Sequence, residues 1–253
     1  MNTQEQTGLR RGLSRDAIKY IAMFTMLLNH IANIFLAPGL LQEALIDIGY
    51  FTAPVMCWFL VEGYGYTRSK KRYALRLAVF AALSELPFCL AFTWDGVLSY
   101  YGMNMIFTLL ICFLILLAEE KMRPGLPRRL VQAALTLLTA VLPSDWPLLA
   151  PVYTLLFAWA RGSRRRTKWA FFWSGAALWA MLWLGSVGWL PVWRGLLYAC
   201  GGTAGMVLAA VAILYCYNGR RAEHGQRFSK WFFYWFYPVH LLVLGLIRVA
   251  LQP

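Results

Sequence analysis

Nine long apolar runs dominate the chain and leave it few ways to fold. A run of about 20 apolar residues can cross a bilayer as a helix, which satisfies its own backbone hydrogen bonds. With 60% hydrophobic and 14% charged residues, the 253-residue chain is too apolar for a soluble domain. We therefore predict an all-α integral membrane protein, one polytopic domain covering residues 1–253, with about nine transmembrane helices. The runs cover residues 17–37, 44–66, 74–92, 103–118, 128–142, 146–160, 168–187, 193–216 and 231–250.

The fifth and sixth runs are the exception, because they are short and only Pro143 to Pro147 separates them. They can form a hairpin that does not cross the bilayer fully.

Basic residues support this division of the chain. Of the 24 lysines and arginines, 22 fall before the first run or after the second, fourth, sixth and eighth, and only Arg194 and Arg248 fall on the other side. Cytoplasmic loops of membrane proteins are enriched in such residues. We therefore expect a multi-pass protein of the inner (cytoplasmic) membrane, surrounded by lipid, with its N-terminus in the cytoplasm and its C-terminus outside.

The same topology explains most of the net charge of +13. The segment RGSRRRTK at 161–168 resembles a nucleic-acid patch in isolation, but here it is an expected cytoplasmic turn, so we predict no nucleic-acid partner. The five cysteines lie in apolar runs without CxxC or CxxH spacing, and we predict neither a disulfide framework nor a metal site.

Two histidines inside the apolar runs are the first candidates for function. His30 lies 11 residues past Lys19, and His240 lies 10 past Lys230. At about 1.5 Å per residue, both lie roughly 15 to 17 Å deep, so they can face one cavity if the first and last helices are neighbours. Ionisable residues within spans are rare and usually functional. A histidine kept neutral by burial suits a general base, although a purely structural hydrogen bond is the alternative.

Two acids also lie inside the runs, and a buried carboxylate needs a cation, a donor or a proton. Glu62 is followed six residues later by Arg68, so it can pair with Arg68 or Arg76, or it can orient a histidine. Glu85 precedes Pro87, which can leave it near the outer surface.

Three arginines after the second run share one helical spacing. Arg68, Arg72 and Arg76 follow an i, i+4, i+8 pattern and would form one cationic stripe entering the third helix. Such a stripe can hold the phosphates of a cytoplasmic ligand.

Polar side chains in apolar surroundings complete the candidate site. Asn29, Asn33 and Asn104 can donate hydrogen bonds to an oxyanion, and Thr108 lies one turn beyond Asn104. We expect these four residues to face the substrate.

Four segments resemble the TraX family, named for the conjugative-plasmid protein that acetylates the N-terminus of pilin. They are LLNH, APVMCWFLVEGYGYTRSKKRYALRL, NMIFTLL and FYPVHLLVL, in the family's order. This family is similar to the polytopic acyltransferases that use cytoplasmic acetyl-CoA and a histidine of the first span. The residues that match its motifs are His30; Glu62, Gly63, Thr67, Arg68, Tyr73 and Arg76; and Asn104, Thr108 and His240.

The resemblance implies roles for these residues. It implies acetyl-CoA as cosubstrate, catalysis by His30, His240 and Glu62, and coenzyme binding by the arginines with Tyr73. The family commonly has an aspartate before the first-span histidine, where this chain has Asn29. Glu62 or Glu85 would then orient His30.

We therefore predict a membrane acetyltransferase that modifies a membrane or extracytoplasmic acceptor, such as a pilin N-terminus or a glycan. The acyl group passes directly or through an acyl-histidine. The alternatives are a small proton-coupled transporter with a relay of His30, Glu62 and His240, and a non-catalytic assembly factor. A carrier often shows internal repeats, and none is evident here.

Overall fold

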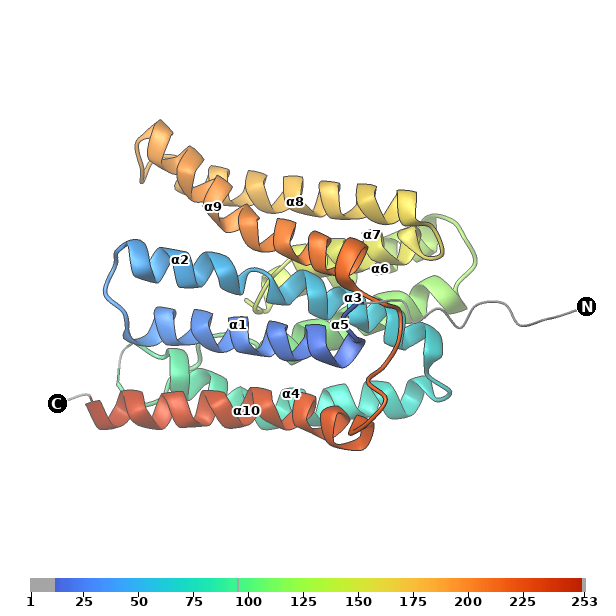
Figure 1. Ribbon diagram of the computed structural model, residues 1–253, viewed down its shortest axis with the longest axis horizontal. Coiled ribbons are helices and arrows are strands. Elements are labelled where there is room, and N and C mark those ends of the chain that lie inside the picture. Colours follow the sequence, from blue (N-terminus) through green and yellow to red (C-terminus); the bar gives the residue numbers. More distant parts are fainter. Residues whose placement is uncertain (1–11, 95, 252–253) are drawn as a thin grey trace, which may run out of the picture.

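The computed structural model describes residues 12–94 and 96–251. Over those residues the chain forms helices and no strand, and the helices lie along one long axis (Figure 1). The predicted all-α class is confirmed. The helices are α1 (Arg15–Phe35), α2 (Leu40–Gly49), α3 (Thr52–Tyr66), α4 (Lys70–Phe92), α5 (Met105–Lys121), α6 (Leu126–Val141), α7 (Leu149–Ala160), α8 (Arg164–Ser186), α9 (Val192–Val211) and α10 (Gln226–Leu251), with a π-helical turn (Ala212–Cys216) after α9.

These helices correspond to the nine apolar runs, since α2 and α3 share one run and the π-helical turn extends α9. Successive runs point in opposite directions. Because their number is odd, α1 begins at one end of the bundle and α10 ends at the other (Figure 1). Arg10 and Arg11, which contribute to the charge asymmetry, lie outside the described residues. Among the described residues, five segments are long and apolar enough to cross a membrane: Arg15–Phe35, Leu40–Tyr66, Lys70–Phe92, Val192–Cys216 and Gln226–Leu251.

The second pass is interrupted between α2 and α3, and α9 packs closely against the interruption. Pro54 lies in the first turn of α3, where its missing N–H costs little. The glycines of α9 permit the approach: a Cβ on Gly205 would lie 2.5 Å from the carbonyl oxygen of Asp47 and 2.7 Å from the backbone nitrogen of Phe51. Small residues commonly let membrane helices approach in this way.

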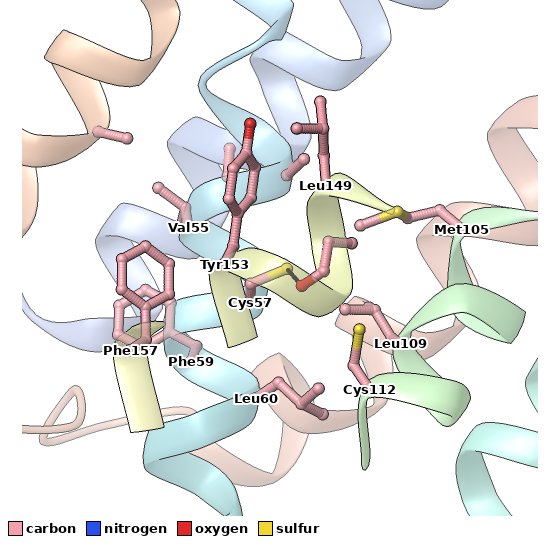
Figure 2. Close-up of a cluster of buried hydrophobic side chains, with 14 of the residues drawn as sticks. Val55, Cys57, Phe59, Leu60, Met105, Leu109, Cys112, Leu149, Tyr153 and Phe157 are labelled. Atoms are coloured by element: carbon pink, nitrogen blue, oxygen red, sulfur yellow. Dashed lines mark hydrogen bonds between the residues drawn. The ribbon is translucent and has the colours of Figure 1, made fainter. Parts of the chain in front are cut away.

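A buried apolar core forms where α3, α5 and α7 meet (Figure 2). Cys57 of α3 donates a weak hydrogen bond from its sulfur to the carbonyl of Ala150 at 3.6 Å, and Tyr153 and Phe157 of α7 are fully buried. With 12 residues, α7 is only about 18 Å long. This core holds the short α7, and with it the loop 142–148 that precedes α7, against the N-terminal end of α5.

That loop is fixed to α5 by two hydrogen bonds of Asp145. The backbone N–H of Asp145 donates to the carbonyl of Met103 at 2.8 Å, and the hydroxyl of Thr108 donates to the carbonyl of Asp145 at 2.7 Å. Both bonds use the backbone of Asp145, so its carboxylate is left for other contacts.

At the other end of the bundle, residues 217–225 lie between the π-helical turn and α10 and cover the start of α1. They are here called the covering segment. The backbone N–H of Arg15 donates to the carbonyl of Arg220 at 2.8 Å, and the backbone N–H of Ala222 donates to the carboxylate of Asp16 at 3.0 Å. Ser14 caps α1 by accepting from the backbone N–H of Ala17. The covering segment brings further basic residues of the chain next to α1.

Candidate functional site

The two membrane histidines meet at the contact between α1 and α10. His30 Nδ1 lies 2.8 Å from His240 Nε2, and the two rings are nearly coplanar, with an angle of 2° between their planes. His30 is 6% exposed and His240 is 7% exposed, so water does not compete for this bond. The two histidines therefore lie at the same level of the bundle, and α1 and α10, whose proximity the sequence left open, are in contact.

The hydrogen bonds of His240 fix the protonation pattern of the pair. His240 Nδ1 lies 2.7 Å from the carbonyl oxygen of Phe236, which can only accept, so Nδ1 carries the proton. In a neutral His240, Nε2 then has a lone pair and accepts from Nδ1–H of His30. When His30 is also neutral, its Nε2 has no proton and is free to act as a base.

His30 lies on the wall of a cavity of about 220 Å³, here called the histidine cavity. The ring of Phe92 contacts His30 edge-on at 5.3 Å, which holds the imidazole plane. His240 does not line this cavity. The other lining residues include Asn29, Asn33, Gly49, Tyr50, Thr52, Phe88, Tyr101, Met105, Asp145 and Trp146.

Asn29 and Asn33 line the histidine cavity, but their amide groups already have partners. Asn29 Nδ2 donates to the carbonyl of Ile46 at 3.1 Å, and Asn33 Nδ2 donates to the carbonyl and the side-chain oxygen of Asn29 at 2.9 and 3.0 Å. The second N–H of Asn29 therefore remains for a ligand, whereas that of Asn33 does not.

Asn104 and Thr108, expected to face the substrate, instead hold the helices around the cavity. Asn104 caps α5, because its side-chain oxygen accepts from Ile106 and Phe107, while its Nδ2 donates to the carbonyl of Ala81 and to Glu85. Thr108 donates to the loop of Asp145. Neither residue lines the histidine cavity, so the oxyanion role proposed for Asn104 is corrected to a structural one.

The two buried acids also differ from expectation. Glu62 pairs with Arg15, with 2.9 Å between Nε and Oε2, and accepts from the hydroxyl of Tyr217 at 2.7 Å. Its partner is thus neither Arg68 nor Arg76, because α3 carries Glu62 to the start of α1. Glu85 binds Asn104 at 2.6 Å. Among the described residues, neither acid has a hydrogen bond to a histidine, so neither orients His30.

A second cavity, here called the basic pocket, lies at the end of the bundle where α1, α4 and α10 begin. Its volume is about 240 Å³, and apolar residues of α3 and α5, including Met56, Leu60 and Ile106, form its inner wall. Its basic side chains come from α1, α4, the covering segment and α10: Arg15, Lys19, Arg76, Arg221 and Lys230.

The expected arginine stripe contributes only one member to this pocket. Helix α4 begins at Lys70 and is capped by Ser69, so Arg68 precedes the helix and cannot share a helical face with Arg72 and Arg76. Arg68 and Arg72 are exposed and do not line the pocket. Arg76 and Tyr73 do, with the guanidinium of Arg76 5.5 Å from the centre of the Tyr73 ring.

The basic pocket and the histidine cavity lie in sequence along the same helices. On α3, Thr52 and Ala53 line the histidine cavity and Met56 lines the basic pocket one turn later. On α5, Met105 lines the histidine cavity and the next residue, Ile106, lines the basic pocket. The two cavities therefore lie next to each other along the length of the bundle.

Sequence reasoning missed Asp145, Arg15 and the covering segment. Asp145 lines the histidine cavity, and burial raises the pKa of its carboxyl to about 6. The sequence signal was an acid between Pro143 and Pro147, which alone indicates only a turn. Among the described residues, no group of three or more His, Cys, Asp or Glu side chains is placed to hold a metal ion.

Comparison with known proteins gives a consistent picture. The model of the TraX protein family matches residues 14–248. A curated relative, the probable fimbrial assembly protein FimC, serogroup H1, of Dichelobacter nodosus, is 29% identical over 243 residues, covering 93% of this chain and 96% of the relative. No solved structure matches the chain.

Proposed function

The chain belongs to the TraX family, and on that premise we propose that it is a membrane-bound acetyltransferase. It transfers the acetyl group of cytoplasmic acetyl-CoA to a membrane or extracytoplasmic acceptor, a pilin N-terminus or a glycan. The fimbrial assembly role named for the relative suits an acceptor of the first kind.

One observation carries this proposal: the hydrogen-bond series from the Phe236 carbonyl through His240 to His30 leaves His30 Nε2 unprotonated. Acyl transfer from a thioester needs a base to remove the proton of the attacking hydroxyl or amine. When Nε2 takes that proton, His240 stabilises the resulting imidazolium through the bond to Nδ1. The same nitrogen serves as nucleophile if the reaction passes through an acyl-histidine.

The basic pocket supports acetyl-CoA as the donor. Its five basic side chains suit the phosphates of coenzyme A, and its apolar inner wall suits the uncharged arm that carries the thioester. His30 lies 15 residues along α1 from Arg15, roughly 22 Å, so the arm would extend along α1 toward the histidine cavity.

This arrangement favours a reaction centre over the proton relay of a transporter. A relay of His30, Glu62 and His240 needs the three groups in sequence, but Glu62 is bound to Arg15 and Tyr217 in the part of the bundle that holds the basic pocket. The two histidines bind each other instead.

The direct test of the activity is incubation of the purified protein with acetyl-labelled acetyl-CoA. The acceptors are a peptide with a free N-terminus and a bacterial glycan. We expect label to move to one acceptor only when the protein is present. Transfer of label to neither acceptor would reject the proposed activity.

We also propose that α1, α2 with α3, α4, α5, α8, α9 and α10 cross the inner membrane, with the start of α1 in the cytoplasm, and that the short α6 and α7 form a hairpin between α5 and α8 that need not cross fully. The segregation of the basic residues motivates this topology. Reporter fusions after Gly96 and after Arg165 should then report opposite sides, the first outside and the second cytoplasmic. Finding both on one side would remove a pass between them.

A further inference from the structure

Asp145 is the acidic side chain of the histidine cavity, and its position does not depend on its charge. The loop is held by the backbone N–H and carbonyl of Asp145, bonded to Met103 and Thr108. The carboxylate takes no part in these two backbone hydrogen bonds, and Asp145 lines the same cavity as His30.

The protein supplies no cation for this carboxylate. None of the ion pairs between described residues includes Asp145. No lysine or arginine is among the residues that line the histidine cavity. The backbone N–H of Trp146 donates to this carboxylate, but a buried carboxylate with no cation beside it is still costly, so a positively charged ligand would be stabilised here.

Aromatic rings surround the same position. Tyr50, Tyr101 and Trp146 line the cavity, and Tyr50 packs edge-on against Trp146 at 5.3 Å. The faces of aromatic rings attract ammonium groups, an attraction that strengthens when water is excluded. A carboxylate among such rings suits an ammonium group, which gains from both the negative charge and the ring faces, whereas a hydroxyl gains only a hydrogen bond to the carboxylate.

We propose that Asp145 binds the ammonium group of the acceptor and thereby selects a primary amine over a hydroxyl compound. This inference rests on the proposed acetyl transfer. The bound ammonium group gives one proton to His30 Nε2, and the resulting amine attacks the thioester carbonyl. The C–N bond forms, the C–S bond breaks, and the thiolate takes the second proton from nitrogen. His30 then releases its proton to water.

The test compares wild-type protein with Asp145→Asn, using glycinamide and glycolamide as acceptors. These two small molecules differ only in an ammonium group against a hydroxyl. Asparagine keeps the shape and the backbone bonds, so the variant should fold and bind coenzyme A normally. We expect the KM for glycinamide to rise by about 30-fold or more. The matched control is Asp47→Asn, because Asp47 of α2 faces Gly201 of α9 and does not line the cavity.

A binding measurement keeps the inference separate from the activity. Glycinamide should raise the melting temperature of the wild-type protein and of Asp47→Asn, but not that of Asp145→Asn, and glycolamide should stabilise none of them. If the wild-type protein transfers acetyl to no acceptor, the proposed activity fails while this measurement still decides on Asp145. Equal stabilisation of wild type and Asp145→Asn by glycinamide, or stabilisation of neither, would overturn the inference, as would an unchanged KM.

Discussion

Replacing His30 by alanine should lower acetyl transfer by about 100- to 10,000-fold, the usual contribution of a general base. The change removes the imidazole that lines the histidine cavity but leaves the basic pocket intact, because His30 does not line that pocket. The rate with saturating acetyl-CoA should therefore fall, while the dissociation constant for coenzyme A, measured by direct binding, should not change.

Two further variants make this result specific. His224 lies in the covering segment away from the histidine pair, so His224→Ala should retain normal transfer. His240→Ala should cost less than His30→Ala, because it removes the group that fixes the tautomer of His30 and not the base itself. It should also alter the pH dependence of the rate, which a merely structural role would leave unchanged. Near-normal transfer by His30→Ala would exclude His30 as the base.

Much of this fold could be predicted because each helix is encoded locally. A helix in an apolar environment needs only a long apolar run, and the boundaries of the nine runs differ from those of the helices by a few residues. Counting residues along each helix was enough to place His30 and His240 at one level, but their contact also requires α1 and α10 to be neighbours, which the sequence left open.

The partners of polar residues could not be predicted, because they depend on which helices are neighbours and how each is rotated. The sequence left Glu62 to pair with Arg68 or Arg76 or to orient a histidine, whereas the packing of α1 on α3 brings Arg15 to it. The sequence around Asp145 indicates only a turn, and it is the placement of the short α7 that brings Asp145 to the cavity lined by His30.

Two errors could have been avoided from local signals. Asn104 stands immediately before an apolar helix, which is the usual position of an N-cap residue. Ser69 stands before Lys70 in the same way, and a helix starting there excludes Arg68 from the stripe. A side chain at such a position is bonded to the end of its helix and is therefore less available for a substrate.

Arg76→Ala should weaken binding of coenzyme A by about 10- to 100-fold, since hydrogen bonds to charged groups contribute about 1.5 to 3 kcal/mol. Arg76 lines the basic pocket, and its Nε is buried without a hydrogen-bond partner among the described residues. An unsatisfied buried donor of positive charge suits a phosphate oxygen. Calorimetric titration of the purified protein with coenzyme A measures the change.

The matched comparison is Arg72→Ala, one helical turn earlier on α4. Arg72 is exposed and does not line the basic pocket, so its loss should leave binding nearly unchanged. Titration with pantetheine, which lacks the phosphates, should be insensitive to both substitutions. If Arg72→Ala and Arg76→Ala weaken binding equally, coenzyme A is attracted by the general basic charge of this end of the bundle. If Arg76→Ala weakens pantetheine binding as much as coenzyme A binding, Arg76 supports the pocket without contacting phosphate.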